Sequence, residues 1–89
     1  MRAVISVIGK DTVGILAKVS AVCEKDGVNI LDVTQTILQD LFTMIMLVDL
    51  KGATAPFDKF KEELTALGEK QNLSIHTMHE DIFNSMHKI

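Results

Sequence analysis

The order of elements along the chain predicts an α+β sandwich. Four segments rich in β-branched or alternating apolar residues are typical of strands, and two segments carry apolar residues at helical spacing. Their order is strand, helix, strand, strand, helix, strand, with a short polar turn between the two middle strands. This is the split βαβ order, which gives a four-stranded antiparallel sheet with two helices on one face. Right-handed crossovers fix the hand of each half.

The first strand and the first helix frame a short polar turn. We expect a strand over residues 2–9 and a helix over residues 12–26, which Gly27 ends in a left-handed cap. Asp11 stands where a helix cap is wanted, because its carboxylate can accept from free backbone N–H groups. Gly14 then falls in the first helical turn, where a glycine costs about 1 kcal/mol of helix propensity. Either close packing or the approach of a ligand to the backbone would explain it.

The middle of the sequence predicts a hairpin. The second strand covers residues 29–38 and the third covers residues 41–50, with a tight turn at Gln39 and Asp40. In the second strand, alternation places Leu31, Val33 and Ile37 on one face and Ile30, Asp32, Thr34 and Thr36 on the other. A β-bulge would exchange these faces. In the third strand the core face carries Phe42, Met44, Met46, Val48 and Leu50.

The opposite face of the third strand is also largely apolar, since it carries Ile45 and Leu47. Helices on one side of the sheet would leave this second face exposed. A second copy of the chain is the simplest cover, so we predict a homodimer. The alternative is that the C-terminal helix covers this face within one chain.

The second half repeats the helix–strand pattern and ends in a helical extension. Thr54 is placed to cap the second helix, with Pro56 in its first turn. Its buried stripe consists of Phe57, Phe60, Leu64 and Leu67. A fourth strand covers residues 73–78. We expect one domain over residues 1–79 and a short helical extension over residues 80–89, which must dock on something to persist.

Composition restricts the classes of function. The 89 residues suffice for one small domain, 47% are hydrophobic, and the formal net charge is −3. Without a basic block, nucleic acid and an anionic membrane surface are unfavoured partners. The single cysteine, Cys23, allows no disulfide within one chain, and no secretory signal or membrane-spanning run is visible. A cytoplasmic setting is the default expectation.

Motifs for phosphate, nucleotide and metal binding are absent or incomplete. Gly9 and Gly14 are spaced as in a Walker loop, but the Lys and Ser or Thr that should follow are Ile and Leu. The spacing also fails the dinucleotide fingerprint. His76 and His79 lie three apart on a strand and face opposite sides, so with His87 they are interpreted as surface or rim histidines. We therefore expect no metal, no cofactor and no catalytic residue.

Two segments, residues 8–17 and 27–32, resemble the ACT domain, a small regulatory ligand-binding module. The resemblance extends over residues 3 to about 77. The short C-terminal helix is similar to that of stand-alone bacterial and archaeal ACT proteins. The resemblance implies a non-enzymatic, dimeric regulatory module that binds an amino acid or similar small metabolite at the dimer interface. The alternative is a protein-interaction module that docks on an enzyme or regulator without a small ligand.

The resemblance also implies where a ligand would bind. The implied positions are Asp11, Thr12, Val13, Gly14, Ile15 and Leu16, facing Asn29 and Ile30 of a partner chain. Backbone N–H groups at a helix N-terminus suit a ligand carboxylate. We expect Gly14→Val to abolish ligand binding and to leave the folded dimer intact.

Overall fold

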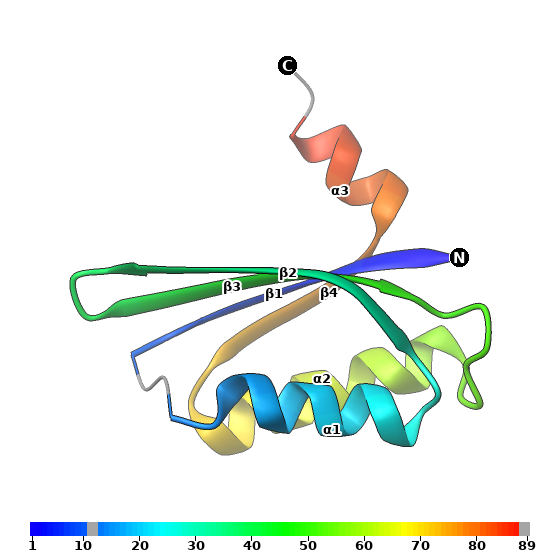
Figure 1. The fold of residues 1–89 in the computed structure, drawn as a ribbon, viewed down its shortest axis with the longest axis horizontal. Coiled ribbons are helices and arrows are strands. Elements are labelled where there is room, and N and C mark those ends of the chain that lie inside the picture. Colours follow the sequence, from blue (N-terminus) through cyan, green and yellow to red (C-terminus); the bar gives the residue numbers. More distant parts are fainter. Residues whose placement is uncertain (11–12, 88–89) are drawn as a thin grey trace.

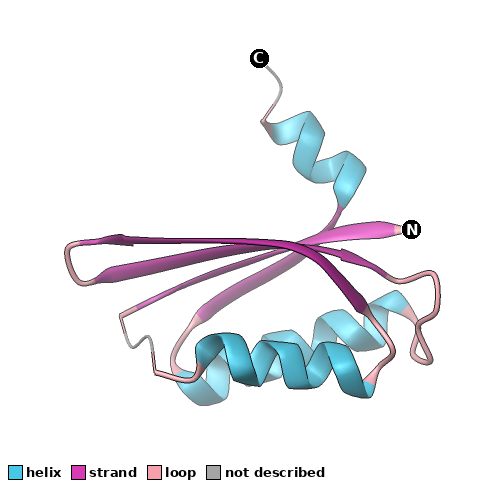
Figure 2. Cartoon of the chain, in the orientation of Figure 1, coloured by secondary structure: helices cyan, strands magenta, loops and turns pink. Residues whose placement is uncertain are grey.

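The computed structural model describes residues 1–10 and 13–87. Its elements are β1 (Arg2–Gly9), α1 (Ile15–Lys25), β2 (Asn29–Leu38), β3 (Leu41–Asp49), α2 (Phe57–Gln71), β4 (Ser74–His79) and α3 (Glu80–Met86) (Figure 1). The four strands form one antiparallel sheet in the order β2-β3-β1-β4. Helices α1 and α2 lie side by side under one face, called the inner face below (Figures 1 and 2). The predicted α+β fold, with a four-stranded antiparallel sheet, two helices on one face and a short C-terminal helix, is confirmed, and this arrangement is ferredoxin-like.

The core lies between the inner face of the sheet and the two helices. It contains Ala3, Ile5 and Val7 of β1, Phe42, Met44, Met46 and Val48 of β3, Ile15, Val19 and Cys23 of α1, and Phe60 and Leu64 of α2. Alternation places every second strand residue on this face. The core face predicted for the third strand is confirmed over these four β3 residues.

A β-bulge in β2 changes which of its residues face the core. Ile30 pairs with Val48, but the next pair joins Asp32 to Leu47, so Leu31 is an extra residue without a partner on β3. Beyond the bulge, Val33 pairs with Met46, whose side chain is in the core. Ile30 and Val33 therefore share the inner face, so the bulge that the sequence left open is present and breaks the strict alternation at this point.

Helix α2 begins later than its predicted cap. The N-cap residue is Pro56, with φ −66° and ψ 157°, rather than Thr54, and the first helical residue is Phe57. Proline fixes φ in this range and lacks an N–H group, so it suits a position just before the helix. The amide of Phe60 donates to the carbonyl oxygen of Pro56 at 3.1 Å, which closes the first turn.

Helix α3 follows β4 directly and projects from the other face of the sheet, called the outer face below (Figure 1). His79 caps it by accepting a hydrogen bond from the Asp81 amide at 3.1 Å. Arg2 of β1 forms an ion pair with Glu80, and its Nε atom donates to Oε1 at 3.0 Å. This pair lowers the pKa of Glu80 and ties the start of α3 to the sheet. The predicted Ile89 of this helix lies outside the described residues.

The length and composition of the helices bear on whether any of them could cross a membrane. Within residues 1–10 and 13–87, no helix is both long and apolar enough to cross a membrane.

Candidate ligand-binding site

Gly14 is the N-cap of α1 and has a left-handed backbone, with φ 73° and ψ 6°. Its carbonyl oxygen accepts from the Lys18 amide at 3.0 Å, the first hydrogen bond of the helix. The expected cap at Asp11 and the placement of Gly14 inside the first turn are therefore wrong. The physical reason is the positive φ, which glycine adopts at no steric cost. Asp11 itself lies outside the described residues.

Close packing does not explain Gly14. A Cβ atom at this position would meet Lys18 Cε at 3.8 Å, which is an ordinary contact. The left-handed backbone thus requires the glycine, and among the described residues a Cβ atom there would meet no close contact. The first amides of α1 point to this space because they have no partner within the helix. The open backbone is what a small anion would need.

The other implied loop residues have different environments. Val13 is 80% exposed and Leu16 is exposed, whereas Ile15 is 3% exposed and belongs to the core. Thr12, like its neighbour Asp11, lies outside the described residues. Ile15 can therefore contribute its amide to a ligand, but not its side chain.

The described residues of one chain do not enclose a ligand beside this loop. A small hollow lies between the loop and α2, but its volume is about 10 Å³, no more than one water needs. Lys18 closes its rim by donating from Nζ to Gln71 Oε1 at 2.7 Å. An amino acid would have to bind outside this hollow and would need further walls.

The two halves of the implied site lie at opposite ends of the sheet. Asn29 pairs with Asp49, which also pairs with Arg2 at the start of β1. β1 ends at Gly9, and the chain then continues to Gly14 and the start of α1 (Figure 1). Asn29 is exposed and Ile30 is half-buried against the core. A single chain therefore does not bring Asn29 and Ile30 to the loop.

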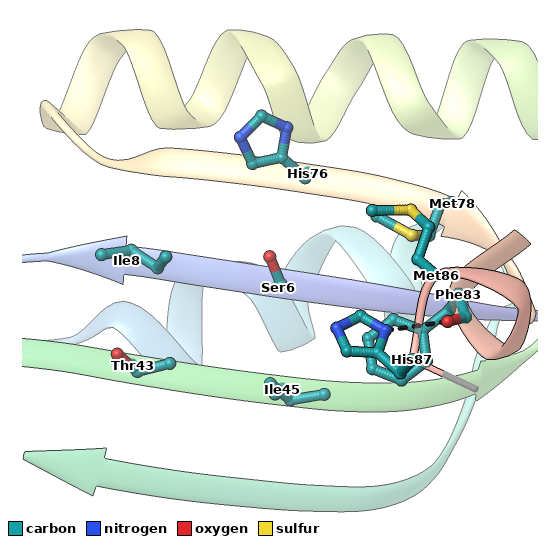
Figure 3. Close-up of a pocket in the computed structure, with 9 residues that line it drawn as sticks. All are labelled: Ser6, Ile8, Thr43, Ile45, His76, Met78, Phe83, Met86 and His87. Carbon is teal, nitrogen blue, oxygen red and sulfur yellow. Dashed lines mark hydrogen bonds between the residues drawn. The ribbon is translucent and has the colours of Figure 1, made fainter. Parts of the chain in front are cut away.

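The outer face carries a larger cavity that the sequence did not predict. Its volume is about 390 Å³, and it lies in the angle between α3 and the sheet (Figure 3). It is lined by Ser6, Ile8, Thr43, Ile45, His76, Met78, Phe83, Met86 and His87. The alternation of β4 and the spacing of Phe83, Met86 and His87 place these side chains toward one space. His76 and His87 were considered only as rim histidines because no local pattern joins them.

A second feature that the sequence did not predict is a pair of carboxyl groups between α1 and α2. Asp26, at the C-terminus of α1, is 4% exposed. Burial raises the pKa of Asp26, and the neighbouring Glu63 carboxyl raises it further. Lys25 Nζ lies 3.1 Å from Glu63 Oε2 and lowers the pKa of Glu63. Asp26 is thus the member of the pair that holds a proton more tightly.

Metal binding finds no support in the part of the chain that the structure describes. No group of three or more His, Cys, Asp or Glu side chains is placed there to hold a metal ion.

Comparison with known proteins identifies relatives over the full chain. The ACT domain family matches residues 2–78. A UPF0237 protein of Clostridium acetobutylicum is 52% identical over 89 residues, and the match covers all of both chains. A UPF0237 protein of Methanocaldococcus jannaschii is 48% identical over 88 residues, covering 99% of this chain and 98% of the relative. The solved structure of an ACT domain protein from Streptococcus pneumoniae has a TM-score of 0.81 and 37% identity, covering 93% of each chain.

Proposed function

Because the chain belongs to the ACT domain family, we propose that it is a non-catalytic regulatory module that binds an amino acid or similar small metabolite between two copies. In this proposal residues 1–79 form the ACT domain and residues 80–89 form an appended helical extension. The observation that carries it is Gly14. Its left-handed N-cap has no side chain of its own and no side-chain cap hydrogen bond, and Lys18 Cε lies 3.8 Å from where its Cβ atom would be.

The free edge of β2 offers a way to complete the site. β2 is an edge strand that pairs with β3 on one side. If two copies paired their β2 strands antiparallel about a two-fold axis at mid-strand, the partner's residue 29 would lie opposite Leu38. Leu38 pairs with Leu41 at the sheet end where β1 reaches Gly9. A second copy would thus bring its Asn29 toward the loop that a single chain keeps far from Asn29.

The chemistry of the two parts suits a zwitterion. The free amides of α1 and the positive end of its dipole favour a carboxylate, with roughly 0.3–1 kcal/mol from the dipole alone. The first turn of α1 carries no acidic residue that would compete. The Asn29 amide supplies both a donor and an acceptor for the ammonium end and the substituent. We place this dimer in the cytoplasm, where the thiol of Cys23 stays reduced.

The test is a melting-shift screen of the twenty amino acids on the full chain, followed by calorimetric titration of each hit. A ligand that binds only the folded state raises the melting temperature by mass action. Asn29→Ala should abolish the shift without unfolding the protein, because Asn29 is exposed. Asn84→Ala, an exposed asparagine on α3, serves as the matched control. A chain that stays monomeric at high micromolar concentration, with and without each amino acid, would exclude the proposed site.

The alternative function is a protein-interaction module without a small ligand. Exposed apolar side chains on the outer face and on α3, namely Ile45, Ile82 and Met86, favour it. Such a module would show no hit in the screen, and the immobilised chain would retain a specific enzyme or regulator. Substituting Ile82 with Lys would then release that protein, whereas Asn29→Ala would not.

A further inference from the structure

The cavity on the outer face has the size and lining of a small-ligand site. Its volume of about 390 Å³ falls in the usual range of roughly 300–1,000 Å³ for such sites. Ile8 and Ile45 form part of its floor, while Phe83 and Met86 of α3 form a wall (Figure 3). Met86 is 65% exposed, although it faces other apolar side chains. An apolar molecule in this angle would cover these groups.

Four polar side chains complete the lining: Ser6, Thr43, His76 and His87. Ser6 is the cross-strand neighbour of His76 on β4 and of Ile45 on β3, so its hydroxyl lies on the floor between them. Ser6, Thr43 and His76 can each donate a hydrogen bond, and His87 can do so into the cavity in its imidazolium form. Among the described residues, no carboxylate lines the cavity. The nearby Glu80 is already paired with Arg2. A bound molecule would therefore present a hydrogen-bond acceptor to this group.

The orientation of His87 is fixed by a hydrogen bond within α3. Its Nδ1 atom lies 2.8 Å from the carbonyl oxygen of Phe83, and because a carbonyl only accepts, Nδ1 must carry the proton. The ring stacks at a tilt on Phe83, with centroids 4.2 Å apart. Figure 3 shows the second ring nitrogen, Nε2, on the side away from α3 and above the sheet. In the imidazolium form Nε2 is a donor that can pair with an anion.

We infer that this cavity is a second ligand site, separate from the Gly14 loop, that takes a small monocarboxylate with an apolar body. The hydrocarbon part lies on Ile8 and Ile45 and against Phe83 and the adaptable side chain of Met86. The carboxylate lies between His87 and the Ser6 hydroxyl. This site consists of residues of one chain, so it needs no partner copy.

The experiment titrates the full chain, labelled at the methionine methyl groups, with sodium octanoate and separately with 1-octanol. We expect saturable one-to-one shifts of the Met78 and Met86 signals, while the core residues Met44 and Met46 stay unchanged. Octanoate should bind about tenfold tighter than octanol, because hydrogen bonds to an ionised carboxylate are stronger than those to a neutral hydroxyl. Equal affinities for octanoate and octanol would overturn the proposed role of His87 and Ser6 in binding the carboxylate.

Substitutions then test the assignment. Ile45→Trp fills the cavity and should remove binding of both probes. His87→Phe keeps the ring but should weaken octanoate about tenfold, to the level of octanol. Ile82→Ala is the control, because Ile82 lies on α3 outside the lining and is 55% exposed.

Three further outcomes would contradict the inference. These are shifts that do not saturate, full octanoate affinity in Ile45→Trp, or shifts of Met78 and Met86 on simple dilution, which would mean that a second copy fills the cavity. Asn29→Ala must retain octanoate binding, so failure of the loop site and failure of this site are distinguishable.

Discussion

Gly68 of α2 lies so close to the carbonyl oxygen of Leu73 that a Cβ atom at position 68 would be 2.8 Å from it. The Leu73 amide also donates to the Gly68 carbonyl oxygen at 2.7 Å, so α2 and the chain entering β4 are held together at this point. Gly68→Ala should lower the free energy of unfolding by about 1–3 kcal/mol, although alanine favours helices, because a backbone atom would have to move. Urea denaturation of the parent and the variant measures this difference.

Gly52→Ala is the control for that variant. A Cβ atom at position 52 would meet the carbonyl oxygen of Gly27 at 3.9 Å, an ordinary contact. Its free energy of unfolding should stay within about 0.5 kcal/mol of the parent. Equal stability of both variants would show that α2 can shift on β4 without cost.

Substitution of Gly14 should destabilise the protein least with asparagine, more with alanine and most with valine. Asparagine tolerates the left-handed region, alanine costs roughly 1–2 kcal/mol there, and a β-branched residue costs more. The expectation that Gly14→Val leaves the fold intact rested on helix propensity, which does not apply to a residue that precedes the helix. Thermal unfolding of the three variants without ligand tests this order, and an unchanged melting temperature in Gly14→Val would contradict it.

Asp26→Asn should stabilise the protein at neutral pH and have little effect near pH 3. The raised pKa means that the folded state holds this proton more tightly than the unfolded state, whose carboxyl titrates near 3.8. The stabilisation by protonated Asp26 is fully present below that value and is lost as pH rises through the folded pKa. The side-chain amide that replaces the Asp26 carboxyl in the variant stays neutral at every pH and can donate to Glu63. Above the folded pKa of Asp26, the free energy of unfolding of the variant should therefore exceed that of the parent by on the order of 1 kcal/mol.

The measurement for Asp26→Asn is urea denaturation between pH 3 and pH 8. Glu63 has a lowered pKa and contributes in the opposite sense, because its stabilisation is lost as pH falls through its folded pKa. Both proteins keep Glu63, so the difference between them mainly reports Asp26. Asp40→Asn, at the exposed hairpin turn, is the control, because loss of its exposed ion pair with Lys10 should have only a small effect on stability. A difference that is constant with pH would contradict the assignment.

Cys23 should react slowly with iodoacetamide in the folded protein. Burial raises the pKa of its thiol from 9.0 to about 11, with a further contribution from Asp26, so the thiolate is about a hundredfold scarcer. Burial in the core also hinders access to the sulfur. Mass spectrometry of alkylation at pH 8, in buffer and in denaturing urea, should show a rate at least a hundredfold lower in buffer. Similar rates would show that α1 opens readily from the sheet.

Much of the fold could be predicted from local patterns. β1 and β2 have the predicted limits, and the core face of β3 follows from its alternation because one side of each strand must be buried. The hairpin at Gln39 and Asp40 follows from the short polar break between two apolar runs. The resemblance to the ACT family rests on residues 8–17 and 27–32, and the family match over residues 2–78 confirms it. Such motifs can be recognised in the sequence without knowing how the chain packs.

Tertiary structure decided the features that depend on residues far apart in the sequence. The bulge at Leu31 arises in the ladder with β3, and the left-handed Gly14 arises where β1 must turn under the sheet to reach α1. Neither changes the local hydrophobic pattern.

The outer-face cavity depends most on tertiary structure. Its lining includes both His76 of β4 and His87, which follows α3, because α3 leaves the sheet at an angle. Packing of α3 against β1 and β4 sets that angle. The sequence by itself therefore determined the order of the elements and their buried faces, because both follow from periodicity along the chain. Which functional groups share a space was decided only by the tertiary structure, because that depends on backbone geometry and long-range contacts.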